Sequence, residues 1–279
     1  MNGWRAARDA GDRPPRRAAG RDYLARLGAR ASDGATRLYA GLPWLVELTE
    51  ADQLFLSWPV APTVLADRIP APLALDTFDA RAWITLVSFR MERLHLRGLP
   101  PTPGLSSFAE VGCLTCVRLG DERGVWFFRI DAATRLGSEV ARRLFALPYH
   151  RAAVSLDAEG DSRSVRSEGR APRGTVRPEF RARYRPTGPE HEPRPGTLAH
   201  FIAERFVMFS RTERGTLLRG VQARPPRRIR ACDVVVEWNT FPEATGLPGP
   251  AGDLTVWSCG RSVIRTRLPA PVPPAARGR

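Results

Sequence analysis

The chain has 279 residues, of which 43% are hydrophobic, so it is long enough to bury a substantial core in one large domain or two small ones. It carries a net charge of +14, and no window approaches the roughly 18 unbroken apolar residues that a membrane-spanning helix needs. The composition excludes a helical membrane protein, and the Arg-rich N-terminus lacks the apolar run of a secretory signal, so we expect a cytoplasmic protein.

The two ends of the chain hold much of the excess positive charge. Residues 1–40 contain nine Arg and four Asp, and residues 261–279 contain five Arg and no acidic residue. We predict a flexible basic arm over residues 1–41 and a disordered tail over residues 269–279. These ends are expected to bind polyanions weakly and without specificity, and specific contact with RNA, DNA or an anionic membrane stays open.

Residues 42–268 are predicted to form one domain that consists mostly of β-strands. A short helix over residues 62–69 begins with Pro, a second begins at about Ser138, and a third follows Thr197 as its N-cap. A Pro-rich link is expected over residues 186–196. Strands are expected at 52–60, 80–91, 109–119, 124–132, 151–157, 163–169, 180–185, 215–223, 232–241, 254–260 and 262–268. This pattern predicts a mainly β (α+β) fold, an antiparallel β-barrel with a few short helices.

The Cys113–Cys116 pair has the spacing of a metal or redox motif, but its position favours buried structural thiols. A zinc knuckle needs a turn and a redox pair needs a helix N-terminus, whereas residues i and i+3 of a strand point to opposite faces. Cys232 and Cys259 have no partner at metal-binding spacing. We predict no metal, disulfide or cofactor, and the sequence contains no P-loop, G-x-G-x-x-G or G-x-S-x-G motif.

Polar residues inside the predicted strands are candidates for a functional site. Glu110 precedes a mainly apolar run, and Glu237 and Asn239 alternate with apolar residues. In a closed barrel one such set lines the interior, where burial raises the pKa of a carboxyl group and suits it to acid–base chemistry. A paired structural carboxylate is the alternative for each of them.

Four long stretches of the sequence resemble the YqjF-like family of bacterial proteins. They are residues 55–91, 124–154, 197–220 and 236–241, and the resemblance covers roughly residues 45–265. This family is similar to the acetoacetate decarboxylase-like superfamily. The resemblance implies a cone-shaped antiparallel β-barrel with short helices around it, in agreement with the predicted strands.

The stretch ARRLFALPYHRA resembles the part of the decarboxylases that carries their reactive lysine. The resemblance places Arg142 and Pro148 on the matching Arg and Pro of that motif. Tyr149 stands where the Schiff-base lysine would be, and His150 stands at its lysine neighbour. All 43 basic residues of this chain are arginine, so no side chain can form a Schiff base with a carbonyl substrate.

The resemblance also identifies Glu110, in SFAE, as the counterpart of a strand glutamate in the decarboxylases. The polar residues that usually follow this glutamate are replaced by Gly112, Leu114 and Cys116. This departure predicts a less polar pocket.

Three hypotheses for the function follow. The first is a barrel that binds a small anionic or carbonyl-containing molecule without covalent turnover. Its polar end would be formed by four converging side chains, Arg142, Tyr149, His150 and Glu110, and Asn239 is a further ligand-binding candidate. The second is a non-covalent acid–base enzyme, such as a lactonase, isomerase or lyase, with His150 and Glu110 as catalytic residues and Arg142 on an anionic substrate. The third is an interaction module that uses the Arg-rich ends. Assembly as a homo-oligomer stays open.

Overall fold

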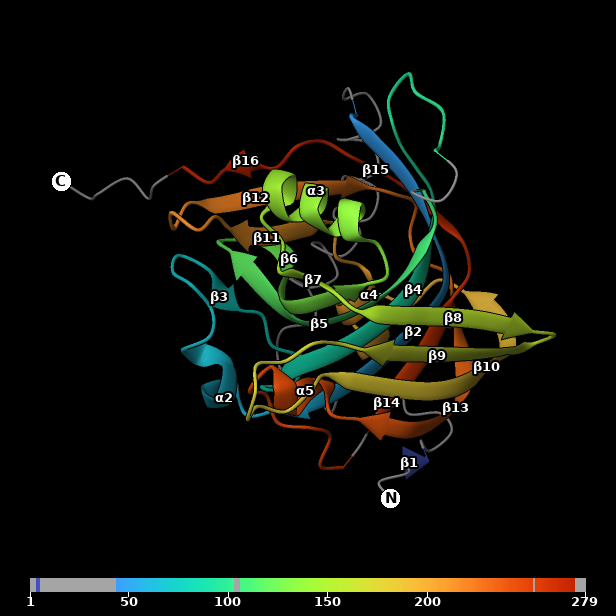
Figure 1. The fold of residues 1–279 in the computed structure, drawn as a ribbon. Helices are drawn as coiled ribbons and strands as arrows, with labels where there is room; N and C mark the ends of the chain where they lie inside the picture. The colour runs from blue at the N-terminus through green and yellow to red at the C-terminus, as the bar shows by residue number, and fades with distance from the viewer. Residues whose placement is uncertain (1–3, 6–43, 103–105, 253, 274–279) are drawn as a thin grey trace.

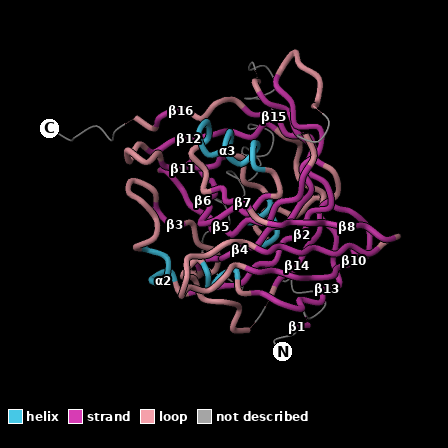
Figure 2. The backbone as a smooth tube through the Cα atoms, in the orientation of Figure 1, coloured by secondary structure: helices cyan, strands magenta, loops and turns pink. Residues whose placement is uncertain are grey.

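The computed structural model describes residues 4–5, 44–102, 106–252 and 254–273, and β-strands predominate in them (Figures 1 and 2). None of the helices in these ranges combines the length and the apolar character that a membrane crossing requires. Most of the predicted arm, and residues 274–279 of the predicted tail, lie outside the described residues.

The helices of the described residues are short, and the strands belong to one continuous sheet. The helices are α2 (Pro62–Ala66), α3 (Arg135–Phe145), α4 (Leu198–Ala203) and α5 (Phe241–Ala244). The strands are β1 (Trp4–Arg5), β2 (Val46–Val60), β3 (Ala74–Leu75), β4 (Ala82–Leu96), β5 (Phe108–Leu119), β6 (Glu122–Ala132), β7 (Tyr149–Arg151), β8 (Ala153–Glu159), β9 (Ser162–Glu168), β10 (Glu179–His191), β11 (Val207–Arg211), β12 (Leu217–Ala223), β13 (Ile229–Asn239), β14 (Thr255–Cys259), β15 (Ser262–Thr266) and β16 (Ala270–Pro271).

Seven strands close into a barrel. Their order is β15-β12-β11-β6-β5-β4-β2, and β2 pairs with β15 to complete the ring. The pairings are antiparallel except between β11 and β6, which run parallel. The predicted mainly β barrel with a few short helices is therefore confirmed, with one parallel pair that the strand pattern did not indicate.

Strand β2 belongs to the barrel and also begins an outer sheet. Residues 46–50 pair with β15, and residues 53–57 pair with β14. Between the two segments Asp52 adopts a positive φ of 51° at a β-bulge, a conformation that Asp tolerates better than most residues. From β14 the sheet continues through β13, β10, β9 and β8, which lie across one side of the barrel in Figure 1.

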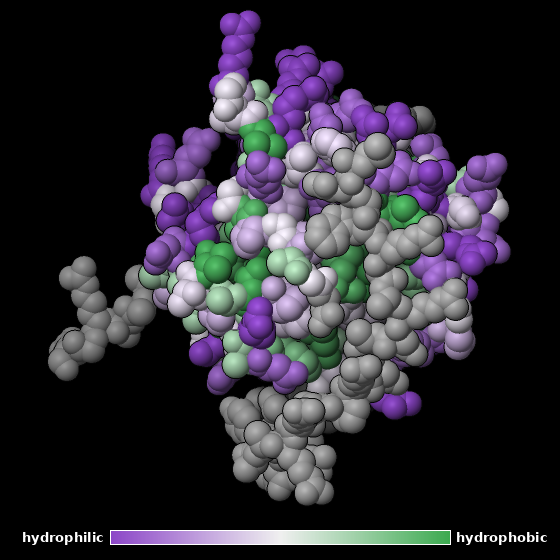
Figure 3. Space-filling model, turned by 90° about the horizontal axis from the view of Figure 1, so that it is seen from below, coloured by the Kyte–Doolittle hydropathy of each residue, from purple (hydrophilic) through white to green (hydrophobic). Residues whose placement is uncertain are grey.

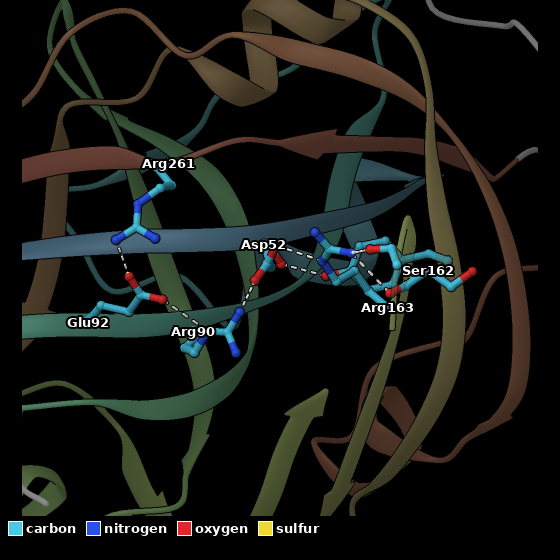
Figure 4. A network of polar contacts seen from close by, with 8 residues as sticks. Asp52, Arg90, Glu92, Ser162, Arg163 and Arg261 are labelled. Carbon is cyan, nitrogen blue, oxygen red and sulfur yellow. Dashed lines mark hydrogen bonds and ion pairs between the residues drawn. The ribbon is translucent and has the colours of Figure 1, made fainter. Parts of the chain in front are cut away.

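A polar network at Asp52 ties the barrel to the outer sheet (Figure 4). One carboxylate oxygen accepts from Arg90 on β4, and the other accepts from Nε of Arg163 on β9 at 2.7 Å. The backbone carbonyl of Asp52 accepts from the hydroxyl of Tyr184 on β10 at 2.5 Å. Arg90 continues the network to Glu92, which also binds Arg261.

The central strands are buried on both faces, because the barrel interior and the outer sheet each need an apolar surface. On β4, Ile84 and Leu86 pack against the outer sheet, whereas Val87 and Phe89 belong to the interior cluster. On β5, Cys113 lies in the outer cluster and Cys116 in the interior one. The two thiols therefore lie on opposite faces of one strand, and burial raises the pKa of Cys113 to about 12.

Two predicted boundaries need correction. Helix α3 begins at Arg135 rather than near Ser138, because the Thr134 side chain is the cap that accepts from the backbone N–H of Gly137. The expected Pro-rich link at 186–196 is partly a strand, since β10 runs on to His191 and pairs with β13.

The face seen from below in Figure 3 shows hydrophilic side chains around hydrophobic ones.

Candidate functional site

The barrel encloses a cavity of about 410 Å³, within the range of roughly 300–1,000 Å³ that is usual for sites binding drug-sized ligands. Its exposed lining residues come from α3, from the end of β4 and from the chain that follows β4. These segments therefore border the mouth of the cavity. The interior wall is mainly apolar. Its largest apolar side chains come from several barrel strands: Phe55, Val87, Phe89, Met91, Phe108, Leu114, Phe127, Ile130, Met208 and Ile264.

Glu110 is the most deeply buried carboxyl group of the cavity wall, with 1% of its surface exposed. On β5 it pairs with Phe89 of β4 and Ala132 of β6, and strand alternation places Gly112 and Leu114 on the same wall. The expected less polar pocket agrees with this placement. Gly112 also makes room for the Phe127 ring, which would lie 2.9 Å from a Cβ atom there.

Tyr149 meets Glu110 because of how α3 ends. Ala146 takes a left-handed conformation with a φ of 50° and ends the helix, and Ser210 donates to the carbonyl of Phe145 at 2.6 Å. Leu147 and Pro148 then lead into β7, which pairs parallel with β6. The Tyr149 hydroxyl donates to Oε2 of Glu110 at 3.2 Å.

The remaining carboxyl oxygen of Glu110, Oε1, is buried and has no hydrogen-bond partner. Burial raises the pKa of Glu110 to about 8, the hydrogen bond from Tyr149 lowers it and the charge of Glu50 raises it further. Burial and the neighbouring Glu110 raise the pKa of Tyr149 well above its ordinary value. The raised pKa values favour the neutral, protonated form of both groups at neutral pH. Oε1 is the carboxyl oxygen of Glu110 that the hydrogen bond from Tyr149 leaves without a partner.

Two buried arginines also line the cavity, and each is paired with a carboxylate. Nη1 of Arg227 donates to Glu50 at 2.9 Å and also to Gln53. Nη1 of Arg205 donates to Asp76 at 2.5 Å, while its Nη2 has no partner. The charges of the cavity wall are thus largely balanced at neutral pH.

His150 and Arg142 do not line the cavity. His150 follows Tyr149 on β7, and successive side chains of a strand point to opposite sides. Burial and the charges of Arg129 and Arg142 lower the pKa of His150 to about 4. Arg142 lies on the outer side of α3 and pairs with Glu139 at 3.0 Å. The expected convergence of four side chains therefore holds for Glu110 and Tyr149 only.

Asn239 and Glu237 lie on β13, in the outer sheet rather than in the barrel. Oδ1 of Asn239 accepts from the backbone N–H of Phe241 at the start of α5. Glu237 is exposed and pairs with Arg183 at 2.7 Å. Neither residue reaches the cavity, because β13 joins the ring only through β14. Among the described residues no three His, Cys, Asp or Glu side chains gather as metal ligands.

Sequence reasoning missed the pair of Glu50 and Arg227, which are 177 positions apart. The sequence did contain a signal for Glu50. In VELTE, strand alternation places Glu50 on the same face as the apolar residues Val46 and Leu48, ahead of the predicted strand. Arg227 lies in the run RPPRRIR, where nothing in the sequence distinguishes it from Arg224, Arg228 or Arg230.

The chain is similar to proteins of one family over most of its length. The model of the DUF2071 family, described as uncharacterized conserved protein, matches residues 48–262. The uncharacterized protein YqjF of Bacillus subtilis (strain 168) is 30% identical over 210 residues, which cover 75% of this chain and 85% of that protein.

Several solved structures share the fold at low sequence identity. An acetoacetate decarboxylase-like enzyme from Sphingomonas wittichii RW1 has a TM-score of 0.59 and 13% identity, covering 83% of this chain and 94% of that one. The acetoacetate decarboxylase of Legionella pneumophila has a TM-score of 0.58 and 12% identity, covering 82% and 87%. The enduracididine biosynthesis enzyme MppR, complexed with a condensation product of pyruvate, has a TM-score of 0.58 and 9% identity, covering 82% and 90%.

Proposed function

The chain belongs to the DUF2071 family and has the acetoacetate decarboxylase-like fold, and from this premise we propose that it binds a small, neutral, carbonyl-containing molecule inside its barrel. Glu110 donates a hydrogen bond from Oε1 to the ligand's carbonyl oxygen. Tyr149 positions Glu110 through its own hydrogen bond to Oε2.

The unpartnered Oε1 atom of Glu110 is the observation that carries this proposal. Burying a polar atom without a partner costs about 1–3 kcal/mol. A ligand acceptor in the cavity removes that cost and receives a proton that Glu110 holds at neutral pH. MppR, which shares the fold, is complexed with pyruvate. Pyruvate is an anion at neutral pH, so this likeness supports the carbonyl group of the ligand and not its neutral charge.

The charge balance of the wall supports a neutral ligand over an anionic one. Arg227 and Arg205 face the cavity, but Glu50 and Asp76 already accept hydrogen bonds from them. Arg142, which the resemblance suggested for an anionic substrate, is exposed and pairs with Glu139. Both cavity arginines are therefore already paired with a carboxylate, and only Nη2 of Arg205 is left without a hydrogen-bond partner, so the wall offers an anion no unbalanced positive charge.

A Schiff-base mechanism is not proposed, because the sequence has no lysine. Non-covalent acid–base catalysis is a second candidate, favoured by the pKa of about 8 at Glu110. A general acid works best when its pKa lies near the working pH. In that case Glu110→Gln removes turnover of a lactone or enolisable ketone while it retains binding.

Titration calorimetry with 2-nonanone, a neutral ketone, tests the proposal. Glu110→Leu replaces the carboxyl donor with an apolar side chain of similar size, so we expect the affinity for 2-nonanone to fall roughly tenfold or more. Arg143→Gln changes an exposed residue of α3 outside the cavity and serves as the matched control. Equal affinity of the wild type and Glu110→Leu would contradict the proposal.

A further inference from the structure

We propose that the ligand is an elongated, mainly apolar molecule whose body lies between α3 and the barrel wall while its carbonyl oxygen meets Glu110. The inference rests on the proposed function and specifies the chemical class of the ligand. Alkyl ketones, esters or lactones with a chain of several methylenes belong to this class.

The first support is an apolar stripe on α3 that is left partly exposed in the described part of the chain. Leu136, Val140 and Leu144 are spaced four residues apart, so they share one face of the helix. All three line the cavity, yet their exposed fractions are 56%, 44% and 44%. Large apolar side chains on a helix face normally pack against the core, and here that face borders the open cavity instead.

A second segment that lines the cavity repeats the feature. Leu96 and Leu99 also line the cavity and are 44% and 58% exposed. The mouth is thus bordered by apolar side chains from two separate segments of the chain. An apolar ligand that contacts both segments removes this surface from water, and this burial favours binding.

The third support is continuity between the mouth and the polar end. One cavity of about 410 Å³ is lined both by the α3 stripe and by Glu110 with Tyr149. A molecule with only three or four carbon atoms leaves most of this volume empty when its carbonyl oxygen contacts Glu110. A longer chain fills it and reaches the α3 stripe.

A chain-length series of 2-alkanones, from butanone to 2-tridecanone, tests this inference by calorimetry or by displacement of the fluorescent probe N-phenyl-1-naphthylamine. We expect the affinity to rise about fourfold for each methylene buried, until the cavity is full. In Val140→Asp the rise should become clearly weaker, whereas the affinity for butanone stays within about twofold.

Arg143→Gln is the matched control, since Arg143 is an exposed α3 residue outside the cavity lining, and it should keep the wild-type slope. Because Val140 is 44% exposed, its replacement should spare the fold, which thermal unfolding checks. Affinity that is flat with chain length, or a slope unchanged in Val140→Asp, overturns the inference. If butanone binds in a way that depends on Glu110 but the affinity does not change with chain length, only the inference is overturned. If no 2-alkanone of any length binds, the proposed function is overturned as well.

Discussion

The Tyr149 hydroxyl donates a hydrogen bond to Oε2 of Glu110 at 3.2 Å, inside a barrel whose wall is otherwise mainly apolar. The tyrosine holds the carboxyl group in one orientation and leaves Oε1 unpartnered. Burial raises the pKa of Glu110 to about 8 and so favours its protonated form at neutral pH, in which it can act as the hydrogen-bond donor that we propose for the polar end of the cavity.

The raised pKa of Glu110 predicts a pH-dependent loss of stability. Between about pH 4.5 and pH 8 the folded protein holds a proton at Glu110 that the unfolded chain releases. The stabilising contribution is complete below about pH 4.5 and is lost as the pH rises through about 8. In Glu110→Gln this loss is absent, so urea unfolding should show the variant gaining a few kcal/mol relative to the wild type between pH 5 and 8. A difference that does not change with pH would contradict the pKa of about 8.

Tyr149→Phe removes the hydrogen bond that favours the ionised form of Glu110, so the pKa of Glu110 should rise further. The pH at which the affinity for 2-nonanone falls should therefore move upward relative to the wild type. The protein should lose about 1 kcal/mol of unfolding free energy, measured by urea unfolding at pH 7. An unchanged pH midpoint would indicate that the Tyr149 hydroxyl has no influence on the Glu110 proton.

Asp52→Asn should destabilise the contact between the barrel and the outer sheet. Asn tolerates the positive φ of this position, but it removes the charge that binds Arg90 and Arg163. We expect a loss of about 1–3 kcal/mol in urea unfolding. Glu237→Gln, which breaks an exposed pair with Arg183, should cost less than about 1 kcal/mol. Equal effects of the two changes would count against a special role of Asp52.

Borohydride treatment in the presence of acetoacetate should leave residues 140–155 unmodified. Trapping requires an amine that forms an iminium with the ketone, and neither Tyr149, His150 nor any arginine supplies one. Peptide mapping by mass spectrometry is the measurement, with a lysine-containing decarboxylase as the positive control. An adduct mapped to residues 140–155 would contradict the absence of Schiff-base chemistry at this site.

The sequence predicted the barrel because strand periodicity depends on local side-chain order. It also identified Glu110, since a carboxyl group ahead of a mainly apolar strand must either be paired or line a cavity. The pairing of β2 with β15 and with β14 could not be predicted from local sequence patterns, because both partners lie far from β2 in the chain. The pairing with β15, which closes the ring, joins segments more than 200 residues apart.

His150 shows why the rest of the site could not be predicted. The resemblance aligned Tyr149 and His150 as neighbours in one site, but consecutive residues of β7 point to opposite sides, so only Tyr149 reaches Glu110. The expectation for Asn239 depended on β13 lying in the barrel wall. Its place in the outer sheet follows from pairings between distant strands that no single segment reveals.

The affinity for 2-nonanone as a function of pH, in the wild type and in Glu110→Gln, tests the central claim most directly. The ketone is uncharged, Tyr149 keeps its proton, and Glu50 is paired with Arg227, so the titration of Glu110 should control the profile. The account predicts constant wild-type affinity below about pH 8 and a decline of roughly tenfold above it, with no decline in Glu110→Gln, whose amide donates at every pH. A wild-type affinity that is independent of pH from 6 to 10, or the same decline in Glu110→Gln, would contradict it.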